Sequence, residues 1–336
     1  MGERSDYGTS TSEGFITEQL ATLHLRSETW ARFKRNRPAL LSACGLLGLL
    51  LSVFCWPIIL KTAPLLGAHG SAFSQYHDPD RLSDDQFQPP SATHWFGTDV
   101  HGRDLFSRVL FGAQVSLLVG LMGTIVSLVI GVLWGAISGY AGGRLDAIMM
   151  RMVDVLYSLP SIIFVIVLIT TLEGRLKNLL GGVAGPGLDR TTRLFFLVIG
   201  LGAVSWLTMA RIVRGQVLSL RQRPFVDASR ALGASATRIL RCHIIPHTLG
   251  VVIVYLALTV PAIILYESFL SYLGLGIQPP MASWGSLIAE GAEQINPVRI
   301  YWWLIIFPGC FLVTTLLALN FLGDGLRDAW EVGRRD

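Results

Sequence analysis

The sequence has 336 residues, of which 51% are hydrophobic and 15% are charged, and its formal net charge at pH 7 is +4. Soluble domains carry about 25% charged residues on average, and a soluble core cannot bury this much apolar surface. The composition therefore excludes an ordinary soluble globular protein and predicts an all-α membrane protein whose helices are partly solvated by the lipid bilayer.

Six apolar stretches have the length of about 17–25 residues that a helix needs to cross a bilayer. Pro160, Pro261 and Pro308 lie within three of them, and membrane helices tolerate interior prolines because neighbouring groups satisfy the freed carbonyls. The sequence therefore predicts six transmembrane helices, within residues 39–60, 109–143, 155–172, 194–210, 248–266 and 300–322.

The lysines and arginines between these stretches are distributed unevenly. Residues 1–38 carry six and residues 211–247 carry seven, whereas residues 273–299 carry one. Cytoplasmic loops of membrane proteins carry the excess of positive charge, and a cytoplasmic N-terminus assigns 18 cations to the inside and nine to the outside. We therefore expect a multi-pass protein with both termini in the cytoplasm.

These assignments divide the chain into tails, an isolated first helix and a larger membrane domain. Alternating aromatic and basic residues at 30–37 fit an interfacial helix on the inner membrane surface, and a simple determinant of topology would explain them equally well. The expected parts are a cytoplasmic tail at 1–38, the first transmembrane helix at 39–60, an extracytoplasmic segment at 61–108, a five-helix membrane domain at 109–323 with a basic loop at 214–247, and a cytoplasmic tail at 324–336.

Two features of the spans are candidates for helix packing and for substrate passage. Gly131, Gly135 and Gly139 recur every four residues, so they lie on one helix face where backbones can approach closely. That face fits either a tight seam beside a pathway or ordinary helix packing. Glu267 directly follows the fifth span, where a charge is costly to bury. It fits either a pathway for a cationic group or an ion pair with an arginine at the outer interface.

Motifs for catalysis and for metal binding are absent from the sequence. There is no G-x-x-x-x-G-K-[ST] motif, which cradles nucleotide phosphates, and no H-E-x-x-H motif. His243 and His247 are four residues apart, but Pro246 breaks the helix that would align them as metal ligands. We therefore expect no catalytic residue, no metal site and no cofactor in this chain.

The basic loop contains signals for two short helices around a glycine turn. Pro224 suits the first turn of a helix, Gly233 suits the left-handed residue that follows one, and Ser235 can cap a second helix. The second helix carries Ile239 and is expected to stop before Pro246. A DNA-binding helix–turn–helix is the alternative, but about 35 residues between two spans are too few for a domain with its own core, so we expect no nucleic-acid partner.

This loop resembles the cytoplasmic EAA loop of bacterial ABC-importer permeases. The resemblance is carried by residues 227–229, by Gly233 and by residues 244–246, with Asp, Ser and Ile in place of the family's Glu, Ala and Leu. Further segments are similar to the dipeptide, oligopeptide and nickel permease class, and match the second of its two permease subunits. These segments are residues 96–104, 154–160, 270–280, 283–285 and 320–328.

The resemblance implies the six-helix fold of a type I ABC-importer permease in the bacterial inner membrane. It also implies a second homologous permease subunit as a heterodimer partner, two ABC ATPase subunits that bind the loop, and an extracytoplasmic substrate-binding protein. The partner ATPases would supply the energy, because this chain has no nucleotide-binding motif. The residues expected to carry the coupling are Phe225, Asp227, Ala228, Ser229, Leu232, Gly233, Ile239 and Pro246.

The class implies a short peptide as the cargo, and this is the substrate that we expect. Uptake of a nickel chelate or of a peptide-like antibiotic by the same machinery is the alternative within the class. A membrane scaffold without transport activity is the alternative from another class, and it would require none of the three kinds of partner.

Overall fold

The regular secondary structure of the described residues is helical, and no strand occurs among them. The expected all-α class is therefore confirmed. Of the interfacial helix expected at 30–37, residues 30–32 lie outside the described residues, residues 33–35 are helical, and α2 begins at Arg37. Most of the N-terminal tail also lies outside the described residues. The computed structural model describes residues 33–62, 82–179, 186–279 and 281–331.

Five long helices have the length and apolar composition to cross a membrane: α2, α4, α7, a helix that runs from α9 through α10, and α12. A bent pair, α5 and α6, makes a sixth span if its two halves are counted together. In chain order the helices are α2 (Arg37–Thr62), α4 (Leu105–Ala141), α5 (Gly143–Tyr157), α6 (Ser161–Leu179), α7 (Pro186–Leu220), α8 (Pro224–Ala231), α9 (Ala236–Ile239), α10 (Ile245–Tyr272), α11 (Trp284–Glu293) and α12 (Trp303–Glu331).

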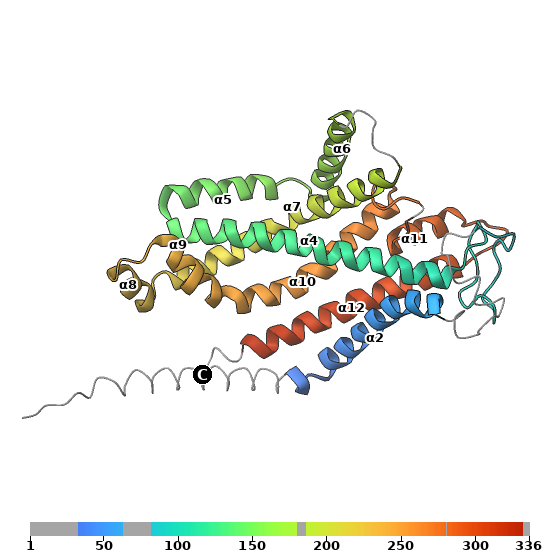
Figure 1. The fold of residues 1–336 in the computed structure, drawn as a ribbon, viewed down its shortest axis with the longest axis horizontal. Coiled ribbons are helices and arrows are strands. Elements are labelled where there is room, and N and C mark those ends of the chain that lie inside the picture. The colour runs from blue at the N-terminus through green and yellow to red at the C-terminus, as the bar shows by residue number, and fades with distance from the viewer. Residues whose placement is uncertain (1–32, 63–81, 180–185, 280, 332–336) are drawn as a thin grey trace, which may run out of the picture.

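The third expected span, at 155–172, is not a continuous helix. α5 ends at Tyr157 and α6 begins at Ser161, and the two helices are bent by 92° relative to each other. Pro160 accounts for the break, because proline disfavours helical backbone in the preceding residue and lacks the N–H that continues a helix. Figure 1 shows α5 lying beside α4, and α6 packs against α7 through Val165 and Ile169.

A close seam between α4 and α7 organises the bundle, and these two make the most extensive contact of any pair of described helices. A Cβ atom at Gly131 would lie 2.6 Å from the Cβ of Met209, and one at Gly135 would lie 2.5 Å from the carbonyl oxygen of Ala210. Gly139 meets α7 in the same way further along the seam. Helix packing therefore accounts for all three glycines, since any side chain would push the helices apart.

Two helices extend beyond the expected boundaries. α7 continues through Leu220, so Arg214 lies in a helix rather than in the basic loop expected at 214–247. α12 continues to Glu331, into the stretch at 324–336 that was expected to be a tail. The glycines near that boundary face neighbouring helices instead of ending α12.

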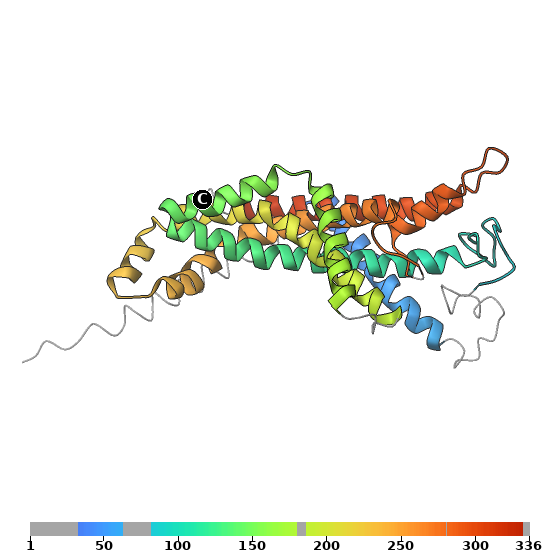
Figure 2. The same cartoon turned by 90° about the horizontal axis from the view of Figure 1, so that it is seen from above.

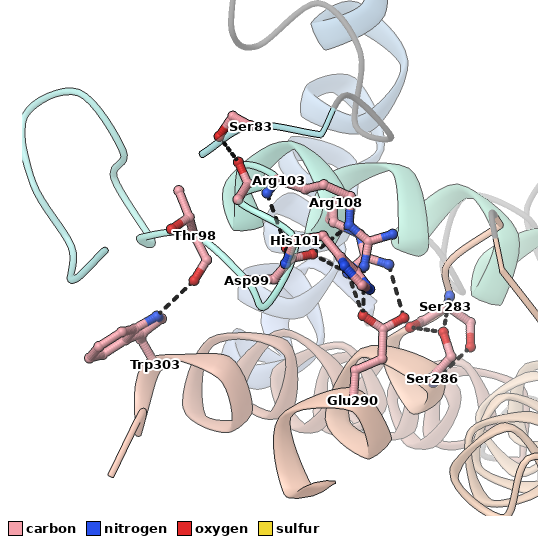
Figure 3. A network of polar contacts seen from close by, with 11 residues as sticks. Ser83, Thr98, Asp99, His101, Arg103, Arg108, Ser283, Ser286, Glu290 and Trp303 are labelled. Atoms are coloured by element: carbon pink, nitrogen blue, oxygen red, sulfur yellow. Dashed lines mark hydrogen bonds and ion pairs between the residues drawn. The ribbon is translucent and has the colours of Figure 1, made fainter. Parts of the chain in front are cut away.

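The described part of the segment at 61–108 folds against α11 and α12. The ring of Phe96 stacks on that of Phe307 with centroids 4.0 Å apart. The indole Nε1 of Trp303 donates to the carbonyl oxygen of Thr98 at 3.2 Å (Figure 3). This segment lies at the end of the molecule opposite to α8 and α9 (Figures 1 and 2). The long helices therefore join two separate polar ends.

Candidate functional site

The two short helices expected around a glycine turn are present at one end of the bundle (Figure 1). α8 begins with Pro224, Gly233 follows it with a φ of +78°, and Ser235 accepts a hydrogen bond from the backbone N–H of Arg238 at 3.4 Å. These three local predictions are confirmed. A Cβ at position 233 would meet no atom within 4 Å, so the backbone conformation alone favours glycine there.

The second helix does not stop before Pro246, and this expectation is wrong. α9 continues through a π-helical turn at Leu240–Ile244 into α10. The backbone N–H of Ile245 donates to the carbonyl of Leu240, as in a π-turn. The wider turn accommodates the proline, whose ring would clash with a carbonyl of a regular α-helix. The loop is therefore continuous with a membrane-crossing helix.

The loop exposes one set of apolar side chains and buries another. Leu232 is 89% exposed and Phe225 is 36% exposed, and Ala228 is exposed as well. Ile239 is only 1% exposed and packs in the same apolar cluster as Val226. Ile239 therefore anchors the loop to the helical body, and its expected part in the coupling stays a prediction. The exposed apolar side chains remain available to a partner.

Polar side chains stabilise α8, and an aromatic contact holds it against α10. The carboxylate of Asp227 pairs with Arg230 at 3.2 Å, and the hydroxyl of Ser229 donates to the carbonyl of Phe225 at 2.8 Å. The ring of Phe225 stacks on His247 of α10, with centroids 5.2 Å apart. Asp227 and Ser229 thus form contacts inside α8, and α8 itself packs against α10.

Two arginines attach the loop to the end of α4. The Nη1 of Arg221 donates to the carbonyl oxygens of Gly139 and Tyr140, at 3.2 and 3.3 Å. The guanidinium carbon of Arg230 lies 5.4 Å from the centroid of the Tyr140 ring, which is a cation–π geometry. The last turn of α4 is therefore contacted from the end of α7 and from α8.

Ion pairs hold α5 against α7 close to this point. Asp146 accepts two hydrogen bonds from Arg214, at 2.5 and 2.6 Å, and a third from the hydroxyl of Ser138. Asp154 pairs with Arg211 at 2.8 Å. Bidentate pairs between arginine and carboxylate fix orientation as well as distance. The start of α5 and the ends of α4 and α7 are thus joined.

A second polar site lies at the opposite end of the molecule, where a network of charged side chains is buried (Figure 3). Asp99 accepts hydrogen bonds from Arg103 at 2.6 Å and from Arg108 at 2.7 Å. Glu290 on α11 accepts from Arg108 at 2.6 and 3.0 Å and from Arg103 at 3.1 Å. Two cations face two carboxylates, so the charges compensate one another.

Sequence reasoning did not find this network. Arg108 offered one signal, because it lies directly before the second expected span, where an arginine without a partner would be costly. In the structure its side chain is 1% exposed. Its partner Glu290 is 182 residues away in the chain. No local spacing connects two residues at that distance, so the pairing required the structure.

Asp104 caps the start of α4 beside this network. Its carboxylate accepts from the backbone N–H of Ser107 at 2.9 Å and contacts Nδ1 of His94 at 3.2 Å. Burial raises the pKa of the Asp104 carboxyl above its ordinary value of 3.8, and the hydrogen bonds from Ser107 and His94 oppose that rise. Within the described ranges, no three His, Cys, Asp or Glu side chains are grouped as metal ligands.

Glu267 on α10 is fully buried, with a side chain surrounded by serines. Its carboxylate accepts from Ser271 at 2.7 Å and from Ser116 at 3.0 Å. The hydroxyl of Ser116 also accepts the backbone N–H of Trp284, which starts α11, at 3.3 Å. Among the described residues no arginine pairs with Glu267, so that alternative is wrong. A role in substrate passage stays a prediction.

The sequence matches the family model described as binding-protein-dependent transport system inner membrane component over residues 131–335. It is 42% identical over 310 residues to the dipeptide transport system permease protein DppC of Bacillus subtilis (strain 168), covering 92% of this chain and 86% of the relative. It is 48% identical to the oligopeptide transport system permease protein OppC of Haemophilus influenzae, covering 71% and 70%. The corresponding protein of Escherichia coli (strain K12) is 43% identical, covering 89% and 88%.

Proposed function

The chain belongs to the family of binding-protein-dependent transport system inner membrane components, and we propose that it is the permease subunit of an ATP-driven importer of short peptides. The observation that carries the choice of cargo is its similarity, over most of its length, to permeases named for dipeptide and oligopeptide transport. Its membrane-crossing helices agree with a multi-pass protein of the bacterial inner membrane.

Three kinds of partner complete the proposed importer. A second homologous permease forms the pathway together with this chain, and a binding protein delivers the cargo from outside. Two ATPase subunits bind the loop that contains α8 and α9, where Leu232 and Phe225 are exposed. The sequence supports this division of labour, because it has no motif for binding nucleotide phosphates.

The orientation we propose places both termini and the α8–α9 end in the cytoplasm. The seven arginines at 211–247 support it, since positive charge accumulates on the cytoplasmic side. The start of α4 and the short helix α11, which carry Arg108 and Glu290, then lie on the outer side, at the end of the molecule opposite to α8 and α9 (Figure 1).

In the proposed mechanism the ATPases displace α8 and α9 when they close on ATP. α9 is continuous with α10 through the π-helical turn, and α8 is bound to α4 through Arg230 and Tyr140. The displacement is therefore applied to two membrane helices at once. Energetic coupling of this kind needs a contiguous mechanical contact between the two sites.

Growth on peptides tests the proposed cargo. An amino-acid auxotroph that lacks this gene should fail to grow on some of the di- to pentapeptides that supply the required amino acid to the parent strain. The wild-type gene should restore growth. Unimpaired growth on every peptide, with loss of nickel-dependent growth, would favour uptake of a nickel chelate. Changed sensitivity to a peptide-like antibiotic alone would favour that cargo, and no uptake defect of any kind would favour the scaffold.

A further inference from the structure

We propose that Tyr140, in the last turn of α4, is the residue through which the α8–α9 loop moves the corner where α4 meets α5. We define this corner as residues 138–146. The inference rests on the proposed function, in which ATPase subunits displace α8. It assigns to Tyr140 a positioning role that lies outside the loop itself.

Tyr140 contacts the loop through its aromatic ring and through its backbone carbonyl group. Its ring lies under the guanidinium of Arg230, which belongs to α8, with 5.4 Å between the guanidinium carbon and the ring centroid. Its carbonyl oxygen accepts from Arg221, which follows α7, at 3.3 Å. A displacement of α8 therefore meets the aromatic side chain of α4 through a contact that has both apolar and electrostatic character.

The corner is built to move as one piece. Gly142 and Gly143 have φ values of +66° and +56° and reverse the chain between α4 and α5. Beyond the turn, Asp146 is held by the hydroxyl of Ser138 and by both guanidinium nitrogens of Arg214. The ends of α4 and α7 and the start of α5 are therefore tied together, and force on Tyr140 acts on all three.

α4, which has Tyr140 in its last turn, is long enough to carry a displacement to the other side of the membrane. α4 has 37 residues, which corresponds to about 55 Å at the rise of an α-helix. Its opposite end carries Arg108, which is bound to Asp99 and Glu290. Tyr140 and the network around Arg108 thus lie at opposite ends of one helix.

A cysteine reporter at the corner tests the proposal without knowledge of the cargo. Arg144 is exposed beside the turn, and we would introduce Arg144→Cys after replacing the native cysteines by serine. The chain is assembled with its partner permease and ATPases in lipid vesicles. The measured quantity is the change in the rate of maleimide labelling on addition of ATP and vanadate. The variants are Tyr140→Leu, Tyr140→Phe, Arg230→Gln and the double variant Tyr140→Leu with Arg230→Gln.

We expect Tyr140→Leu to reduce the nucleotide-dependent change in labelling roughly two- to fivefold, the factor that matches a cation–π contact at a partly exposed site. Tyr140→Phe keeps the ring and should keep the change. Arg230→Gln should reproduce the effect of the leucine variant, and the double variant should add little to either. A leucine variant that responds like the unmodified protein, or a phenylalanine variant as impaired as the leucine variant, would overturn the proposal.

Two further outcomes separate this inference from the proposed function. If the ATPases assemble with the reporter protein but its labelling does not change with nucleotide, the corner does not move and the role of Tyr140 is refuted. If the ATPases fail to assemble with the otherwise unmodified chain, the proposed function itself is refuted.

Discussion

The guanidinium of Arg108 on α4 lies 2.6 Å from the carboxylate of Glu290 on α11, although 182 residues separate them in the chain. Arg108 has a side chain that is 1% exposed, and it also donates to Asp99 at 2.7 Å. The pair therefore fixes the start of one membrane-crossing helix against a short helix that comes much later in the chain.

Arg108→Gln should destabilise the protein by about 3–5 kcal/mol, because it leaves the carboxylates of Asp99 and Glu290 without their buried partner. Arg103 contacts both carboxylates and limits the loss. The measurement is the thermal unfolding of the purified protein in detergent. Arg151→Gln is the matched control, since Arg151 is exposed. Equal unfolding temperatures for the two variants would show that the network contributes nothing to stability.

Glu267→Gln should be tolerated far better than Glu267→Ala. Glutamine keeps the size and one acceptor, and the hydroxyls of Ser116 and Ser271 can rotate to meet its amide group. Alanine leaves both hydroxyls without an acceptor and also leaves a cavity, at a cost of about 3 kcal/mol or more. Thermal unfolding compares the two variants. If glutamine is as destabilising as alanine, the negative charge matters and the hydrogen-bonding account fails.

Local sequence signals predicted the parts of the loop that depend on neighbouring residues. Pro224, Gly233 and Ser235 each act on the backbone within a few positions, so their roles could be predicted without the fold. Pro160 and Pro246 were misjudged, because proline can end a helix, bend it or be absorbed in a π-turn. Which of these occurs depends on the neighbouring helices.

Contacts between distant segments could not be predicted. Ile239 lies in an apolar run, and only the fold shows that it packs inside the bundle. Glu267 was expected to face a pathway or an arginine, and its serine partners come from α4 as well as from α10. Periodicity reveals which face of a helix is apolar, but it does not reveal what that face meets.

Asp104→Asn should change how stability depends on pH. Burial raises the pKa of Asp104 above 3.8, so the folded state binds more protons than the unfolded state at this site. The stabilisation that Asp104 contributes is therefore fully present below pH 3.8, and it is lost as the pH rises through the pKa of the folded state. Asparagine keeps an oxygen for the N–H of Ser107 but carries no charge.

The unfolding temperature of Asp104→Asn, relative to the unmodified protein, should accordingly rise with pH from about 4 upward and then level off. His94 contacts the same carboxylate, and the comparison with Asp84→Asn, an exposed aspartate, removes effects common to the whole protein. A difference that stays constant with pH would show that Asp104 has the same affinity for protons in both states.

Labelling of matched exposed positions should establish the orientation. Leu232 is 89% exposed at the α8–α9 end, and Val298 is 87% exposed at the opposite end. In intact cells, Val298→Cys should react with a membrane-impermeant maleimide, and Leu232→Cys should react only after the membrane is opened. The reverse pattern would place the loop outside the cell and would contradict the orientation assigned from the arginines.

The central claim is that the loop around Gly233 transmits ATP hydrolysis to the membrane helices. Gly233→Val forces a branched residue into a left-handed conformation, at a cost of about 1–2 kcal/mol, and alters a site where nothing lies within 4 Å. Gly274→Val is the matched control, because Gly274 has a φ of +76°, also has no atom near its Cβ position and follows α10 at the opposite end.

The most direct measurement compares these two variants in the complete complex, first by co-purification of the ATPases and then by ATP-driven peptide uptake in liposomes. Gly233→Val should insert into the membrane normally and either lose bound ATPase or hydrolyse ATP without uptake, whereas Gly274→Val should retain its ATPase subunits. Assembly and uptake in Gly233→Val at the level of the unmodified protein would show that this loop is not the coupling element.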